Sequence, residues 1–276
     1  MSHVANLWLF GDSVIDNTAY VPEGKDTASQ LRELLPRHTI HNKAVDGMHA
    51  SEFHIGIGPK NPYPVEHAVL SIGGNDALQA AVEETGGYLL QPVPLNRWAK
   101  HLRAFEERFE RIVANLQLHI HSKIPRRGSR SPTTLQRPFP RLKVLSIYTG
   151  WWEDPDVLDT ATVGAALFNE VIYKTAAQHP DIEVIDIRSF MTGRDMFENY
   201  ATAQPLDSSE RDAMQVTDMF IEPSVKGSTA IALELARRFK HERKVELDVA
   251  QTVGMDRRAR MEAADAADAA LLARPK

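Results

Sequence analysis

A mostly apolar segment, residues 4–10, ends abruptly in Gly11, Asp12 and Ser13, and this transition constrains the fold more than any other stretch of the chain. The segment is apolar enough for a strand that is covered on both faces, as in a parallel sheet. Gly11 supplies the backbone freedom that a sharp exit from such a strand requires. Open α/β sheets bind their ligands at the carboxyl ends of the strands, so Ser13 is a candidate functional residue.

A second segment of the same kind, residues 67–72, runs into Gly73, Gly74, Asn75 and Asp76. Alternating strands and helices over residues 4–240 predict an α/β fold, a three-layer α/β/α, flavodoxin-like sandwich with a central parallel sheet. Further strands are expected at residues 39–45, 142–148 and 182–187, and helices at residues 26–35, 77–84, 95–121, 161–177 and 225–241.

These motifs resemble those of the SGNH (GDSL-type) hydrolase family over most of residues 4–240. Gly11-Asp12-Ser13 matches the first block of that family, and Gly73 to Asp76 matches its third block, Gly-x-Asn-Asp. Gly47 stands where the second block has its glycine. The resemblance implies that Ser13 is the nucleophile of an ester hydrolase. It also implies that the N–H groups of Ser13 and Gly47 and the amide of Asn75 bind the oxyanion.

The fifth block of the family is altered in this chain. Family members have Asp-x-x-His just before the last helix, where the histidine is the general base and the aspartate orients it. Here Glu222 stands in the place of the histidine and Met219 in the place of the aspartate. Asp218 is one residue out of register. The sequence therefore lacks the usual Ser-His-Asp triad.

Three interpretations of this alteration remain open. In the first, Glu222 is the base of a Ser–Glu dyad, although a carboxylate of ordinary pKa is a weaker base than imidazole. In the second, a histidine from elsewhere is the base, with His49 a better candidate than His54 because it lies two residues after Gly47. In the third, the protein is a catalytically silent binding protein with this fold, and Glu222 is a structural carboxylate.

Residues that flank the nucleophile or follow another strand end are candidates for substrate binding. Asp12, Asp16 and Asn17 surround Ser13 in the sequence, and Trp151 and Trp152 follow the strand expected at 142–148. The paired tryptophans are equally compatible with a wall of an apolar pocket and with simple packing of their loop. We expect the substrate to be an ester of a small molecule.

Composition narrows the class of protein. The net charge of −5 does not favour nucleic acid as a partner, and the absence of cysteine excludes disulfides and thiolate metal sites. No metal-ligand pattern, Gly-rich phosphate loop or cofactor motif is apparent. No apolar run is long enough to span a bilayer, and the N-terminus has no signal-type segment, so we expect a cytoplasmic protein. The sequence does not indicate an oligomeric state.

The length of 276 residues fits one α/β domain with an extension, which we place at residues 1–241 and 242–276. Seven basic residues and no acidic residue lie between residues 123 and 143, among prolines and serines. We expect residues 123–141 to be a mobile, basic insertion. The Ala-rich, charged residues 242–276 are expected to form a partly helical or disordered tail.

Overall fold

The computed structural model describes residues 5–57, 61–86, 93–122, 140–150, 155–199 and 220–254. The chain divides into two compact units, residues 1–233 and residues 234–276. The first unit contains the sheet and every residue of the site described below. In the second unit, Glu234 pairs with Arg237 and Arg238 one turn further along the same helix.

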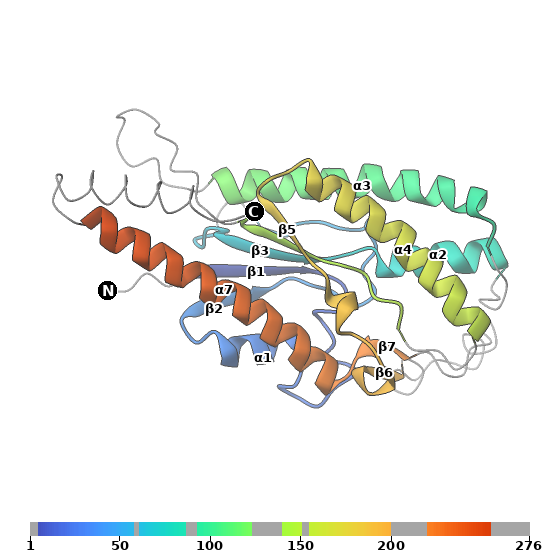
Figure 1. Cartoon of the computed structure of the whole chain (residues 1–276), viewed down its shortest axis with the longest axis horizontal. Coiled ribbons are helices and arrows are strands. Elements are labelled where there is room, and N and C mark those ends of the chain that lie inside the picture. The colour runs from blue at the N-terminus through green and yellow to red at the C-terminus, as the bar shows by residue number, and fades with distance from the viewer. Residues whose placement is uncertain are drawn as a thin grey trace, which may run out of the picture. The chain divides into compact units, whose positions relative to one another are not determined.

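The first unit is built on a five-stranded parallel sheet with the strand order β2-β1-β3-β4-β5 (Figure 1). This order and direction confirm the predicted flavodoxin-like sheet. The strands are β1 (Ala5–Gly11), β2 (His38–Asn42), β3 (His67–Ser71), β4 (Leu142–Leu145) and β5 (Ile182–Ile185).

Helices cover both faces of this sheet. Helices α2, α3 and α4 pack on one another over one face, while α1 lies over the other (Figure 1). The hydroxyl of Thr229, at the start of α7, contacts Gln30 of α1 at 2.6 Å, which places the first part of α7 beside α1. The helices are α1 (Thr27–Leu34), α2 (Gly74–Thr85), α3 (Leu95–Ser122), α4 (Pro155–Ala177) and α7 (Val225–Gly254).

The apolar core explains why the central strands read as continuous apolar runs. Trp8 and Phe10 of β1 point into the cluster formed with α2, α3 and α4, whereas Leu7 and Leu9 are buried on the opposite face. A strand that is covered on both faces needs apolar residues at every position. The side chains of Phe105 and Phe168 on the helices complete the main cluster, with their ring centroids 4.9 Å apart.

Several element bounds differ from the sequence predictions. Strand β4 ends at Leu145 rather than at residue 148, and α4 begins at Pro155 rather than at residue 161. Proline is well suited to the first turn of a helix, a signal that the prediction did not use. A short antiparallel pair, β6 (Phe197–Asn199) with β7 (Phe220–Pro223), was not predicted. Strand β7 has only four residues, too few to show the alternation of apolar and polar residues that predicts a strand.

The predicted basic insertion and tail are only partly described. Residues 123–139 and 255–276 lie outside the described residues. At the end of the basic segment, Arg141 is buried and Lys143 is 0% exposed, so residue 141 does not belong to a mobile surface segment. The ammonium of Lys143 lies 3.3 Å from the carboxylate of Glu183 in the neighbouring strand and donates to the carbonyl of Pro140. Helix α7 continues to Gly254, beyond the predicted end at residue 241.

Within the described part of the chain, no helix is both long enough and apolar enough to cross a membrane.

Gly11 is the point at which β1 must turn while still pressed against β3. Its φ is +127°, and a Cβ atom placed on it would lie 1.7 Å from the carbonyl oxygen of Ser71. The next residue donates its N–H to that same oxygen at 3.1 Å. No side chain fits here without separating the two strand ends, so Gly11 is required by close approach as well as by its backbone angle.

We predict that Gly11→Ala lowers the free energy of unfolding by about 4 kcal/mol or more, since backbone strain and a clash with backbone act together. Gly24→Ala is the matched control. Gly24 also has a positive φ of +76°, but a Cβ there meets nothing within 4 Å, so its loss should be about 1–2 kcal/mol. Urea unfolding of both variants measures the difference. Equal losses would contradict the close approach of Gly11 to Ser71.

Candidate active site

Ser13 lies in a tight turn directly after β1. The carbonyl of Asp12 accepts the N–H groups of Ile15 and Asp16 at 3.1 and 3.0 Å, which folds the chain back at the end of the strand. The side chain of Ser13 is only 8% exposed. The serine is therefore held at the carboxyl edge of the sheet, as predicted from the apolar segment before it.

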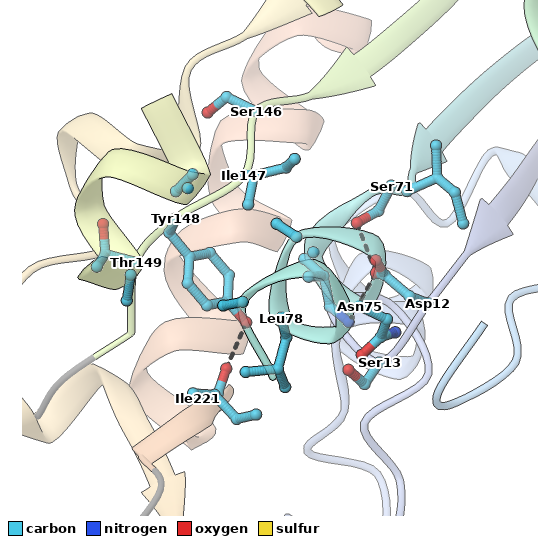
Figure 2. Close-up of a pocket in the computed structure, with 18 of the residues that line it drawn as sticks. Asp12, Ser13, Ser71, Asn75, Leu78, Ser146, Ile147, Tyr148, Thr149 and Ile221 are labelled. Carbon is cyan, nitrogen blue, oxygen red and sulfur yellow. Dashed lines mark hydrogen bonds between the residues drawn. The ribbon is translucent and has the colours of Figure 1, made fainter. Parts of the chain in front are cut away.

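The carboxyl group of Asp12 points into the fold rather than to solvent. Its Oδ1 accepts the hydroxyl of Ser71 at 2.7 Å and the N–H of Val14 at 3.2 Å (Figure 2). Burial raises the pKa of Asp12 to about 7, and the hydrogen bond from Ser71 opposes this rise. Asp12 thus links the ends of β1 and β3 immediately beside Ser13.

Glu222 lies on β7 and lines the same pocket as Ser13, close enough for the serine side chain to lower the pKa of its carboxyl group. The glutamate is 4% exposed, and its Oε2 atom is buried without a hydrogen-bond partner among the described residues. Burial raises its pKa from about 4.5 to about 8; the Ser13 side chain opposes this, while the charges of Asp46 and Asp12 add to it. Helix α7 begins three residues later, and its N-terminus favours the ionised carboxylate, but burial outweighs this effect.

The carbonyl groups on both sides of Glu222 are anchored. The hydroxyl of Tyr148 donates to the carbonyl of Ile221 at 2.8 Å (Figure 2). The amide of Asn17 donates to the carbonyl of Pro223 at 2.8 Å. Together these two bonds fix the short strand that carries the carboxyl group. Tyr148 was not among the predicted site residues, and nothing in the local sequence marks it apart from its position after β4.

Asn17 has a structural role in place of the predicted contact with substrate. It is 0% exposed, and its amide also donates to the hydroxyl of Ser228 at 2.7 Å, while its Oδ1 accepts the N–H of Thr27 at 3.1 Å. With the bond to Pro223, these contacts occupy both ends of the amide. Asn17 therefore joins the turn after Ser13 to α1 and to the segment around Glu222.

Asn75 lies at the second position of α2 and lines the same pocket as Ser13. Its Nδ2 donates to the carbonyl of Met48 at 3.1 Å, which leaves a second hydrogen on that nitrogen. Gly47 lies next to Met48 in an exposed turn and has a φ of +74°. The amide of Asn75 thus contacts the turn that carries Gly47, but Gly47 itself is not among the residues that line the pocket.

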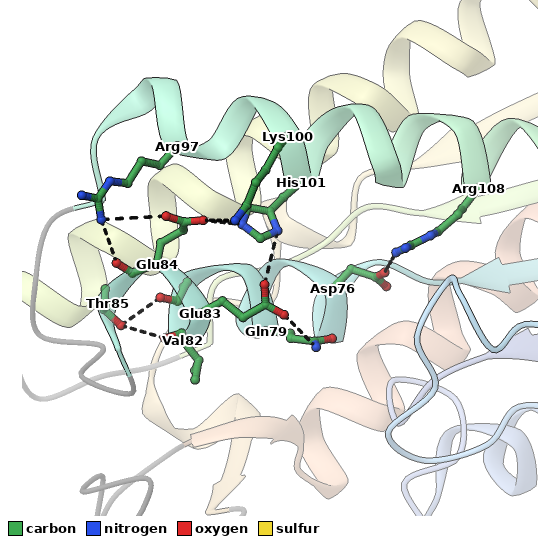
Figure 3. Close-up of polar contacts among 11 residues, drawn as sticks. Asp76, Gln79, Val82, Glu83, Glu84, Thr85, Arg97, Lys100, His101 and Arg108 are labelled. Atoms are coloured by element: carbon green, nitrogen blue, oxygen red, sulfur yellow. Dashed lines mark hydrogen bonds and ion pairs between the residues drawn. The ribbon is translucent and has the colours of Figure 1, made fainter.

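Helix α2 is tied to α3 by ion pairs (Figure 3). Glu84 lies 2.7 Å from Lys100 and 2.8 Å from His101, and the pair with Lys100 contributes most to lowering its pKa to about 2. Near the start of α2, Asp76 lies 3.9 Å from Arg108 and accepts the N–H of Ala50 at 2.9 Å. These contacts hold the helix that carries Asn75.

The remaining candidates lie in different surroundings. Asp16 accepts the N–H of Asp46 at 3.3 Å through one oxygen and the hydroxyl of Thr18 through the other. Trp151 and Trp152 fall outside the described residues. Among the described residues, no group of three or more His, Cys, Asp or Glu side chains is placed to hold a metal ion.

The two candidate histidines are oriented toward other groups. His49 lies close enough to Asp76 to lower the pKa of that carboxyl, and its buried Nδ1 has no hydrogen-bond partner among the described residues. His54 is exposed, and its ring contacts the carbonyl of Glu52 at 3.2 Å. Neither histidine lines the pocket beside Ser13, whereas Glu222 does.

A pocket with a volume of about 100 Å³ opens beside these groups and extends between the helices. Ser13 and Asn75 lie on one side of it, and Tyr148 and Ile221 lie on the other (Figure 2). Most of the lining is apolar, and none of the described residues that line it is Lys, Arg or His. A serine, a raised-pKa carboxyl group and an amide donor therefore converge at an apolar pocket, the set of groups that acyl transfer requires.

No protein-family model matches the sequence, and no curated protein matches it.

Solved structures with the same fold are found among lipolytic enzymes. A phospholipase A1 from Streptomyces albidoflavus NA297 is 17% identical, with a TM-score of 0.52 over 84% of this chain and 99% of that one. An extracellular lipase from Streptomyces rimosus is 15% identical, with a TM-score of 0.51 and the same coverage. The lipase Lip_vut3 from a goat rumen metagenome is also 15% identical, with a TM-score of 0.51 over 84% and 97% of the two chains. The chain therefore has the α/β fold of these lipolytic enzymes, the fold that its resemblance to the SGNH hydrolases implies.

Proposed function

We propose that this protein is a serine-dependent hydrolase that acts on an ester of a small molecule, with Ser13 as the nucleophile and Glu222 as the general base. The observation that carries this proposal is that the side chain of Ser13 and the buried carboxyl group of Glu222 line the same apolar pocket, close enough to interact. The fold shared with lipases and a phospholipase A1 is consistent with it.

In the first half of the reaction, ionised Glu222 takes the proton of the Ser13 hydroxyl while the serine oxygen attacks the ester carbonyl carbon. The carbonyl oxygen becomes negatively charged in the tetrahedral intermediate. Asn75, which lies on the same pocket wall as Ser13, supplies the free hydrogen of its Nδ2 to this oxygen. We assign the N–H groups of Ser13 and Gly47 as the other two donors, following the family resemblance.

Collapse of the intermediate breaks the bond between the carbonyl carbon and the alcohol oxygen. Protonated Glu222 then gives its proton to the departing alcohol, which leaves the acyl group on Ser13 and the carboxylate restored. In the second half, the same carboxylate takes a proton from water as the water attacks the acyl-enzyme. Release of the acid returns the proton to Ser13, so one water is consumed for each ester cleaved.

Burial provides the basicity that an ordinary glutamate lacks. At a pKa of about 8, Glu222 is a stronger base than a free carboxylate and lies close to the range that suits proton transfer at neutral pH. Roughly one-tenth of the groups are ionised at pH 7 by this value. A carboxylate also needs no third residue to fix a tautomer, so a dyad is chemically sufficient.

The charge of the site favours uncharged substrates. Asp12 and Glu222 line the pocket, and Asp46 lies close enough to Glu222 to raise its pKa. The described lining contains no basic side chain to pair with an anionic group. An ester with a negative charge next to the scissile bond would therefore be repelled.

The first test is the reaction of Ser13 itself. Ser13→Ala should abolish hydrolysis of p-nitrophenyl acetate and labelling by a fluorophosphonate probe. Loss of the hydroxyl beside Glu222 should lower the free energy of unfolding by only about 1 kcal/mol, which circular dichroism during urea unfolding can verify. Turnover that survives in this variant would remove Ser13 from the mechanism. A parent protein that neither reacts with the probe nor hydrolyses esters would leave the binding-protein interpretation.

A second test addresses the oxyanion donor. Asn75→Ala should reduce kcat by about a hundredfold or more, the usual effect of removing one such donor. Gln79→Ala is the matched control, since it removes an amide from the exposed side of the same helix. Gln79→Ala should leave kcat unchanged. A loss of less than a few-fold in folded Asn75→Ala would show that this amide serves only the turn at Met48.

The third test concerns the base. Glu222→Gln keeps the shape of the side chain but cannot accept the proton, so kcat should fall by about 10²- to 10⁴-fold. In the parent, activity should rise with pH through an apparent pKa of about 8, since only ionised Glu222 is active. Glu198→Gln, in register with Glu222 on the neighbouring strand β6, is the control and should keep both rate and profile. An active parent that is indifferent to Glu222→Gln would direct the search to His49.

The same substitution should change stability with the opposite sign. Folded protein binds the Glu222 proton more tightly than the unfolded chain, so this group makes the free energy of unfolding fall as pH rises from about 4.5 to about 8. Glutamine removes that contribution. Glu222→Gln should therefore be more stable than the parent at pH 9 and show a weaker loss of stability with pH, measured by urea unfolding.

A further inference from the structure

We propose that the pocket beside Ser13 binds an unbranched, medium-length acyl chain, and that Gly164 and Trp98 set the longest chain it accepts. This inference rests on the proposed esterase function and specifies the acyl group for it. Ser13 and Glu222 line the same pocket as residues of α2, α3 and α4, so the pocket extends from the reacting serine into the helical layer.

The pocket exists because two packed helices present small side chains to each other. Positions three and four residues apart share one face of a helix. On α2 and α4, such positions carry mostly alanine and glycine, which leaves space between helices that are otherwise in contact. The residues that line the pocket are Gly74, Asn75, Ala77, Leu78 and Ala81 on α2, and Val157, Thr160, Ala161, Gly164 and Ala165 on α4.

Gly164 has a specific reason to be glycine although it lies in the middle of α4. Glycine weakens a helix interior, so its presence there calls for a packing explanation. A Cβ atom on Gly164 would lie 2.9 Å from Cη2 of Trp98, closer than a real contact allows. Gly164 therefore lets the indole reach α4, where buried Trp98 forms the α3 side of the pocket.

The indole is held firmly enough to act as a stop. Trp98 packs edge-on against Phe168, with ring centroids 6.4 Å apart and an interplanar angle of 81°. Phe168 in turn lies in the main apolar cluster. A chain that enters from Ser13 therefore meets a fixed aromatic wall.

The size and lining of the pocket define the chain that fits. One water needs roughly 10–15 Å³ by the same measure, so a volume of about 100 Å³ holds roughly seven to ten non-hydrogen atoms. This corresponds to an acyl group of about six to eight carbons. The acyl group also suits a buried pocket better than the alcohol does, because the alcohol must leave while the acyl group remains attached to Ser13.

Chain-length profiles test the inference. The parent should hydrolyse p-nitrophenyl esters of straight-chain acids with a maximum kcat/KM near hexanoate to octanoate and a steep fall beyond decanoate. Ala161→Leu places a larger side chain in the pocket and should lower the octanoate-to-acetate ratio of kcat/KM at least tenfold, equivalent to losing the burial of about two methylene groups. Val163→Leu enlarges an exposed side chain of the same helix and should leave the ratio unchanged.

A variant that gains activity on longer chains distinguishes a change in pocket shape from a mere loss of stability. Trp98→Phe shortens the aromatic wall and should move the maximum toward longer chains, which a merely destabilised protein would not do. If kcat/KM does not depend on chain length and does not change in Ala161→Leu, the acyl pocket is wrong while the esterase function stands.

Direct binding tests the pocket even if the parent cleaves no ester. In that case the proposed esterase function is wrong, and calorimetry on Ser13→Ala tests separately whether the pocket binds an acyl chain. Octanamide should bind to Ser13→Ala more tightly than acetamide does. Adding Ala161→Leu to this variant should weaken the binding of octanamide, whereas adding Val163→Leu should not. Equal binding of the two amides, or no binding of either, would overturn the inference.

Discussion

The burial of one carboxyl group is the constraint on which the proposed chemistry depends. Glu222 is removed from water, its second oxygen has no hydrogen-bond partner within the described part of the chain, and its charged neighbours Asp12 and Asp46 are acidic. Instead of compensating this carboxyl group, the protein fixes strand β7 on both sides of Glu222, through Tyr148 and Asn17. A carboxylate that is so poorly compensated is a much stronger base than a solvated one, and stability is lost in exchange.

Much of the fold was accessible from the sequence because its signals are local. The run before Gly11 and the run before Gly73 both read as buried strands, and both lead into the pocket wall. The parallel sheet that these runs imply is present, with β1 and β3 adjacent so that Gly11 pairs with Ser71. Adjacent parallel strands necessarily bring the residues after their carboxyl ends together, which is why Ser13 and Asn75 could be placed at one edge.

What the sequence did not predict depends on contacts between distant segments. The buried role of Asn17, the anchoring by Tyr148 and the space between α2 and α4 all arise from packing that no local pattern encodes. Lys143 shows the same limit: no local pattern marks this cation as buried, and the register of β4 and β5 supplies Glu183 as its partner. Likewise, the rise in the pKa of Glu222 depends on how deeply β7 is buried, and its sequence position alone favoured the opposite shift.

The bonds of Asn17 also have a consequence for how the protein comes into being. They join residues 206 and 211 positions apart, and Ser13 is made early whereas Glu222 is made late. A chain growing from its N-terminus at about 5–20 residues per second carries Ser13 for roughly 10 to 40 s before Glu222 is added. During that interval Ser13 lacks Glu222 beside it, because strand β7 has not yet been made. Under the proposed mechanism, a growing chain therefore cannot cleave an ester until β7 has been added.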